Sequence, residues 1–291
     1  LTASTGNVTV GAVDTSGGAG TTGPGGAGGA VFLAASSGSV VLNGNVTTFG
    51  GTSTTGAKAV GGRVTFASPV VVAAPITLST SGGGGVAAGG PVSFASTVDG
   101  GNSLSINATL GNVTMSGPVG SITPLPELRL VNAGNFTLAQ TFSGGLLNGN
   151  VTGTAALNGV ATVNVTGTAV NLTAGTMSVV GGIVSTGSGA VNLTGSTAVV
   201  LAEAASIVTT SPTAGVTSGN VNIVGTGNAT LNLAGTIDAS GSLNPAGQGG
   251  AGGFVFVTTG TGNATIGAID TSGGQSQQGG SITGGDAGNV T

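Results

Sequence analysis

Residues 5–18 read TGNVTVGAVDTSGG, and two features of this stretch recur along the chain. Val8 and Val10 alternate with polar residues, a period of two that is typical of a half-buried β-strand. The Gly-Asn pair in front of them suits a tight turn, because both residues tolerate positive φ. The second half, VDTSGG, reads as another short strand that ends in a glycine turn. The stretch therefore predicts turn, strand, turn, strand and turn in succession.

Both phrases recur along the sequence, which is the signature of a repeat architecture. Steps between equivalent first residues are roughly 21 to 33 residues, within the range of solenoids; we take as equivalent Val8, Val31, Val64, Val92, Val113 and Phe136. Copies of the first phrase are GNVTV from Gly6, GAVFL from Gly29, GRVTF from Gly62, GPVSF from Gly90, GNVTM from Gly111, GNFTL from Gly134, GAVNL from Gly189, GNVNI from Gly219 and GNATI from Gly262. Copies of the second are VTTFGG from Val46, ITLSTSGG from Ile76, TIDASG from Thr236 and IDTSGG from Ile269.

The repeats predict an all-β fold, a right-handed parallel β-helix (β-solenoid) that is continuous over residues 1–291. Two strands per coil joined by short turns cannot form hairpins with a common inward face, whereas stacked parallel coils satisfy every strand from above and below. Glycine does not recur with a collagen-like period of three along the chain. The longer steps contain glycine-rich inserts, which we expect at one edge of the coils: Gly17–Gly29, Ser81–Gly90, Ser240–Gly253 and Ser272–Gly288.

The composition limits both the core and the partners. Aromatic residues are 3% of the chain, and Trp, Tyr, Cys and His are absent, so we expect a thin core of small aliphatic side chains. Charged residues are also 3%, and Lys58, Arg63 and Arg129 form no basic run, which argues against nucleic-acid binding. The longest apolar stretch, Val70–Leu78, is broken by Pro75 and is too short for a membrane helix.

The titratable residues are too few and too scattered to predict catalysis. Without histidine there is no side chain that ordinarily titrates near neutral pH, so we predict no enzyme, no catalytic residue and no cofactor. Asp238 and Asp270 are expected one above the other; a shared calcium ion is conceivable, but Asx turns are favoured and we predict no metal. The glycines at Gly83–Gly85 lack the lysine and helix of a phosphate-binding loop. The acidic residues are Asp14, Asp99, Glu127, Glu203, Asp238, Asp270 and Asp286.

Three polar or irregular features remain open to more than one interpretation. Pro118–Leu130 has two prolines near its centre and predicts an edge loop or kink, either a bulge, which we favour, or a binding protrusion. Thr47 and Thr48 hint at an outward threonine ladder that would bind carbohydrate or ice. Asn-x-Thr sequons are either glycan acceptors or, more plainly, stacked amide ladders; they include Asn7, Asn112, Asn135, Asn192 and Asn263.

The two ends of the sequence match each other. TGNVTVGAVDTSGG from Thr5 returns as TGNATIGAIDTSGG from Thr261, and the sequence stops at GNVT, the start of another first phrase. Neither end shows a capping helix or a charged terminal coil. We therefore expect either that the chain is a segment of a longer one or that copies stack head to tail into a filament.

The GNVT, AVNLT and IDTSGG phrases, with glycine-rich inserts between them, resemble the repeat regions of filamentous haemagglutinin-like bacterial exoproteins and related β-helix adhesins. The resemblance implies a secreted rod at a bacterial cell surface that displays loops or provides length. The expected function is thus an extracellular structural protein, a stalk, fibre or matrix component, with itself as partner in a head-to-tail or lateral homopolymer. The alternative is an adhesin whose loop edge or Thr-rich face binds cell-surface glycans, a host surface or ice.

Overall fold

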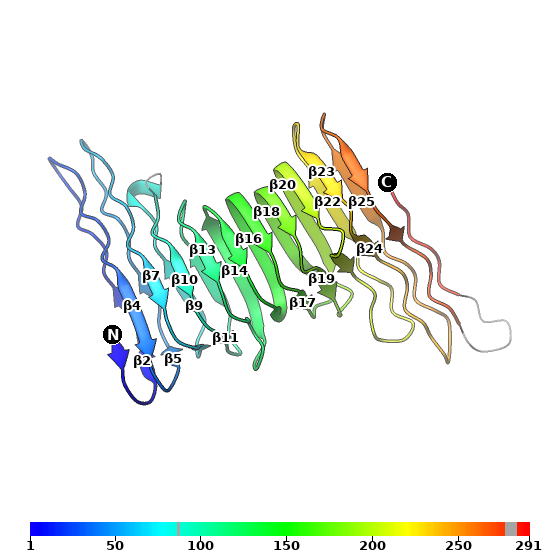
Figure 1. Cartoon of the computed structure of the whole chain (residues 1–291), viewed down its shortest axis with the longest axis horizontal. Coiled ribbons are helices and arrows are strands. Elements are labelled where there is room, and N and C mark those ends of the chain that lie inside the picture. The colour runs from blue at the N-terminus through cyan, green and yellow to red at the C-terminus, as the bar shows by residue number, and fades with distance from the viewer. Residues whose placement is uncertain (86–87, 277–283) are drawn as a thin grey trace. The chain divides into compact units, whose positions relative to one another are not determined.

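The computed structural model describes residues 1–85, 88–276 and 284–291, and it consists largely of short parallel strands wound into coils (Figure 1). The chain divides into two compact units: unit 1 is Leu1–Ser143 with Asn148–Thr154, and unit 2 is Gly144–Leu147 with Ala155–Thr291. Strand β16 (Phe142–Leu157) contributes residues to both. The prediction of an all-β parallel β-helix is confirmed.

Each coil of unit 1 contributes to three ladders, A, B and C. Ladder A contains β1 (Thr2–Ala3), β4 (Val31–Ala35), β7 (Val64–Phe66), β10 (Val92–Phe94), β13 (Val113–Met115) and β15 (Phe136–Leu138). Ladder B contains β2 (Val8–Val10), β5 (Val40–Leu42), β8 (Val70–Val72) and β11 (Val98–Asp99). Ladder C contains β3 (Val13–Asp14), β6 (Val46–Thr47), β9 (Ile76–Ser79), β12 (Leu104–Asn107) and β14 (Leu125–Ala133).

Unit 2 has the same plan, with ladders D, E and F. Ladder D contains the first halves of β18 (Thr168–Val179) and β20 (Ala190–Leu201), then β22 (Val221–Gly225) and β25 (Val255–Thr259). Ladder E contains the second halves of β18 and β20, then β23 (Thr230–Leu233) and β26 (Ala264–Ile266). Ladder F contains β17 (Ala161–Val163), β19 (Ile183–Ser185), β21 (Ser206–Val208), β24 (Thr236–Asp238) and β27 (Ile269–Asp270).

The reading of two strands per coil is therefore wrong, because each coil has three. Val31, Val64, Val92, Val113 and Phe136 do stack in ladder A as expected. Val8 lies instead in ladder B, opposite Val40. The alternating phrase describes any half-buried strand of a coil, so its copies alone do not say which ladder a strand joins.

The core consists of inward side chains stacked in rows, which follows from the period-two alternation of the strands. In ladder C, Leu78, Ile106 and Leu130 form one such row, and each is almost fully buried. The aliphatic core is confirmed, but it also holds aromatic rings. Phe66 and Phe94 stack face to face with ring centroids 4.7 Å apart and an interplanar angle of 8°.

The glycine-rich inserts leave the coil between ladder C and ladder A, so in unit 1 they share one edge (Figure 1). Successive inserts are joined by backbone bonds, for example from Gly17 N to Phe49 O at 2.8 Å. The two legs of one insert are also bonded, as from Gly26 N to Gly18 O at 2.9 Å. The predicted one-edge placement is confirmed for the described parts; Ser81–Gly90 and Ser272–Gly288 each contain residues outside them.

These legs lie so close together that glycine is required at defined positions. A Cβ on Gly17 or Gly20 would overlap the carbonyl groups of the returning leg, and one on Gly25 or Gly28 would overlap the next coil. Within each leg these glycines are spaced by three residues, the repeat of a polyproline II-type helix, in which glycine allows the closest approach of neighbouring chains. A period of three is thus present locally, although it is absent from the chain as a whole.

A threonine closes the neck of most inserts. In unit 1 the Thr48 hydroxyl donates to Gly62 O at 2.7 Å, and Gly62 N donates back to Thr48 O at 2.7 Å. The same hydroxyl bond joins Thr80 to Gly90 at 2.5 Å and, in unit 2, Thr209 to Gly219 at 2.7 Å. The sequence interpretation of Thr48 as part of an outward ladder is wrong, because its side chain is buried.

We expect Thr48→Val to destabilise unit 1 by about 1–3 kcal/mol, because the substitution leaves a buried carbonyl without its hydroxyl donor. Thr47→Val is the matched control: its side chain points outward from the same strand and should change stability by less than about 0.5 kcal/mol. Urea unfolding followed by circular dichroism measures both. Equal effects would mean that the neck bond contributes nothing.

The interval Pro118–Leu130 is part loop and part strand. Residues 120–124 form an exposed bend, whereas Leu125–Leu130 belong to β14 with Leu125, Leu128 and Leu130 buried. The favoured bulge lies just beyond the interval, where the register of β14 against β12 shifts between Leu130 and Asn132. The edge-loop prediction is therefore wrong for the second half, because alternation of the three leucines outweighs Pro126.

Candidate functional site

Three of the predicted site residues, Asp14, Asp238 and Asp270, close turns of the same kind. In each case carboxylate Oδ1 accepts the backbone N–H two residues ahead, at 2.9 Å from Ser16, 2.9 Å from Ser240 and 2.8 Å from Ser272. The Asx-turn prediction is confirmed. Asp238 and Asp270 lie opposite each other in ladder F, as expected. In the part of the chain that the structure describes, no three His, Cys, Asp or Glu side chains gather as a metal site would require.

These turns make a pH dependence measurable. Bonds from the Ser16 hydroxyl and N–H lower the pKa of Asp14, and bonds from the Ser272 N–H and hydroxyl lower the pKa of Asp270, both below the ordinary 3.8. Because the folded-state pKa is depressed, each carboxylate contributes stability that is present above 3.8 and is lost as the pH falls through the lowered value.

We therefore expect the double variant Asp14→Asn/Asp270→Asn to lose less stability than the parent chain between about pH 5 and about pH 2. Asparagine keeps an Asx turn but does not titrate. Urea midpoints across this range measure the effect. Identical slopes for the two proteins would show that these turns do not stabilise the ionised carboxylates.

The other charged residues are apart from these turns. Asp99 is buried in ladder B, and its Oδ1 accepts the N–H of Ile122 at 2.7 Å and of Thr123 at 3.3 Å, so it anchors the bend of the next coil. Lys58 lies over Gly84 in the insert stack, not beside a phosphate-binding helix. Among the described residues, no helix is long and apolar enough to cross a bilayer.

Asparagine side chains join successive coils in two ways. The Asn135 amide donates to Asn112 Oδ1 at 3.0 Å, which confirms an amide ladder at this pair. Asn7 instead accepts the backbone N–H of Ser39 in the next coil at 2.9 Å. Asn192 lies in ladder D between Asn171 and Asn222. The sequons therefore serve coil-to-coil bonding, whatever else they do.

One outward row of hydroxyl groups runs along ladder A. Its members are half-buried and stand in register on four successive coils: Thr65, Ser93, Thr114 and Thr137. The row is one residue wide within the strands, since each of these strands is three residues long. It is the nearest match in unit 1 to the threonine face that the sequence suggested.

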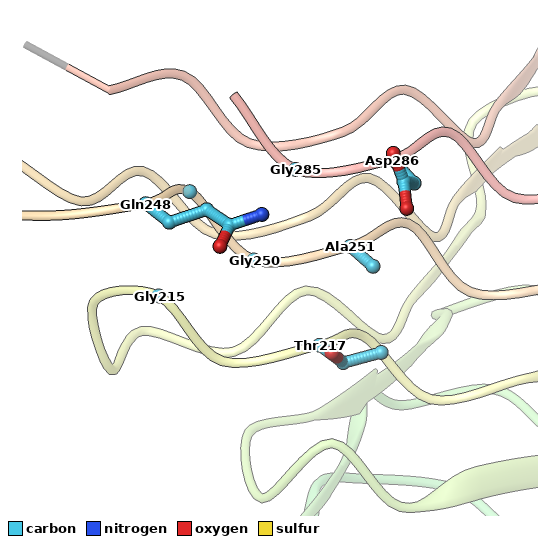
Figure 2. Close-up of a pocket in the computed structure, with 8 residues that line it drawn as sticks. Gly215, Thr217, Gln248, Gly250, Ala251, Gly285 and Asp286 are labelled. Carbon is cyan, nitrogen blue, oxygen red and sulfur yellow. The ribbon is translucent and has the colours of Figure 1, made fainter. Parts of the chain in front are cut away.

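A hollow of about 230 Å³ lies in the insert stack of unit 2 (Figure 2). Thr217, Ala251 and Asp286 lie on three neighbouring legs at one side, and the Gln248 amide extends over the glycine-lined middle. Asp286 is the one ionisable lining residue. This chemistry suits a solvated groove between backbone legs better than a site for catalysis.

The strand edges offer the largest set of unused hydrogen-bonding groups. Among the described pairings, β2 and β3 pair on one side only, with β5 and β6. At the other limit, β26 and β27 pair on one side only, with β23 and β24. In parallel pairing, alternate residues direct their N–H and C=O groups to opposite neighbours, so each edge strand presents a free set. These edges are the candidate functional surface.

No protein-family model, curated protein or solved structure gives a significant match to this chain.

Sequence reasoning located the Asx turns and the matching ends but missed the threonine neck bonds. The signal for them was present: a threonine follows a ladder C or F strand, and the paired glycine immediately precedes the next coil, as in Thr48 with Gly62. The bond spans 10 residues in the shorter inserts and 14 in the longer ones, so it has no fixed sequence spacing.

Proposed function

We propose that this chain is a structural segment of an extracellular rod or filament at a bacterial cell surface, whose function is to provide length by stacking coils. The observation that carries the proposal is that strand after strand of the two units pairs in parallel with the neighbouring coil. Such an architecture is extended by adding coils, each of which contacts only its neighbours. The scarcity of titratable groups further favours a structural role over an enzymatic one.

Secretion, surface location and resemblance to haemagglutinin-like exoproteins belong to the same proposal. Their support is the sequence pattern: no cysteine, a glycine- and asparagine-rich coil rhythm, and inserts on one edge. A chain without cysteine folds without disulfide chemistry after export. Self-association, head to tail or lateral, is the proposed partner interaction.

Negative-stain electron microscopy of the native material tests the proposal. We expect elongated particles whose lengths vary by addition of units. Compact particles of one size would overturn a role in providing length.

The alternative function, an adhesin face for carbohydrate, a host surface or ice, rests on the hydroxyl row of Thr65, Ser93, Thr114 and Thr137. A glycan array and an ice-recrystallisation assay, each with a variant in which all four are alanine, separate the two functions. Binding that the variant loses would favour the adhesin; no binding by either protein leaves the structural role as the better account.

A further inference from the structure

We propose that a second copy of this chain docks on the β26–β27 edge through its own β2–β3 edge, in one register that pairs Ala264–Ile266 with Val8–Val10 and Ile269–Asp270 with Val13–Asp14. This proposal rests on the structural role proposed above and specifies its partner and joint. Its first support is sequence: residues 5–18 and 261–274 differ only by exchanges among aliphatic residues. Stacking these segments repeats the pairing of like with like found inside each unit.

The backbone groups of the two edges are complementary in this register. Leu231 N donates to Asn263 O at 2.8 Å, so Asn263 and Thr265 turn their groups toward β23 and Ala264 turns its groups toward the free edge. Val8 N donates to Ser39 O at 3.0 Å, so Thr9 turns its groups toward the opposite free edge. Ala264 N–H then meets the carbonyl of Asn7 in the second copy, and Thr9 N–H meets the Ala264 carbonyl.

A shared strand completes the joint. Val290 lies opposite Val255, and Val257 N donates to Thr291 O at 2.8 Å, so the next inward position faces Val257. In unit 1, Leu1 occupies that same position opposite Leu33, with its amino group donating to Phe32 O at 2.7 Å. Residues 289–291 of one copy and 1–3 of the next therefore read as one strand, Asn-Val-Thr-Leu-Thr-Ala, with inward apolar residues alternating.

The joint covers apolar side chains that are exposed in the single chain. Leu1 is 70% exposed and Ile266 is 46% exposed, whereas the residues at equivalent inward positions, Leu33 and Leu233, are 2% and 0% exposed. Burial of such side chains is the main favourable term in association. The joint also places Asp14 above Asp270, an arrangement that Asp238 and Asp270 already adopt within unit 2.

Cysteine cross-linking tests the register, since the chain has no cysteine of its own. In the matched variant Thr9→Cys/Thr265→Cys, the two positions lie opposite each other across the joint at about 4.8 Å, within disulfide range. In the mismatched variant Thr5→Cys/Thr265→Cys, they lie roughly 13 Å apart along the strand. Both pairs are on exposed residues, so folding is retained.

We expect the matched chain, mildly oxidised, to give a ladder of multimers on a non-reducing gel that reduction abolishes, and the mismatched chain to stay largely monomeric. Absence of multimers from the matched chain, or equal ladders from both, overturns the register. Filaments of native material without the Thr9–Thr265 cross-link would overturn this joint and leave the structural role intact. Linkage between separate chains and linkage within a longer tandem chain are distinguished by whether the isolated 291-residue chain forms the ladder.

Discussion

Replacing Phe94 with alanine is expected to destabilise unit 1 by about 3–5 kcal/mol, the largest effect of any single core truncation that we anticipate. The ring is 1% exposed and stacks on Phe66, which belongs to the coil before it. Truncation therefore opens a cavity between two coils and removes an aromatic contact worth about 0.5–1.5 kcal/mol beyond its buried area. Because the inward row is continuous, neighbouring coils have little freedom to collapse into the gap.

Phe32→Ala is the matched control for Phe94→Ala. Phe32 lies in the same ladder but points outward and is 49% exposed, so its loss should cost less than about 1 kcal/mol. Chemical unfolding followed by circular dichroism measures both variants. Similar losses of stability would contradict the assigned inward and outward faces of ladder A.

Gly51→Ala is expected to destabilise the insert stack by about 1–3 kcal/mol or more, because no flexible group can move aside. A Cβ at this position would overlap Gly18 O and lie 2.9 Å from Gly26 N, both of which are backbone atoms of the preceding insert. Relief would require the two inserts to separate. That separation breaks the bond from Gly51 N to Gly26 O, which is 2.7 Å long.

Gly18→Ala provides the control for Gly51→Ala, since a Cβ at Gly18 would meet nothing within 4 Å. It should be neutral or stabilising by up to about 1 kcal/mol, because alanine reduces the entropy of the unfolded chain. Limited proteolysis within residues 15–63, together with the unfolding midpoint, measures both variants. Equal protease resistance would show that the legs are not closely packed.

Much of the fold was predictable because strand alternation is a local property. Val64 and Phe66, separated by one polar residue, already define an inward face, and their spacing from Val92 and Phe94 gives a coil. The number of strands per coil was not predictable in this way. Val8 and Val31 carry the same local phrase, and only the pairing of Val8 with Val40 separates their ladders.

The candidate surface was predictable in part. The match between residues 5–18 and 261–274 is visible in the sequence, and so is the turn-forming role of Asp14 and Asp270. The neck bond of Thr48 was not, because a buried hydroxyl and an outward one look alike in a Thr-Thr pair. The glycine legs were also missed, since their contacts join residues of different coils, such as Gly51 and Gly18.

The central claim, that coils stack in parallel to provide length, is tested most directly by cryo-electron microscopy of the native material. The account predicts elongated particles with a continuous axial repeat of about 4.8 Å, the spacing of hydrogen-bonded strands, with three strands per repeat. Particles without that repeat, or with antiparallel pairing along their length, would contradict it.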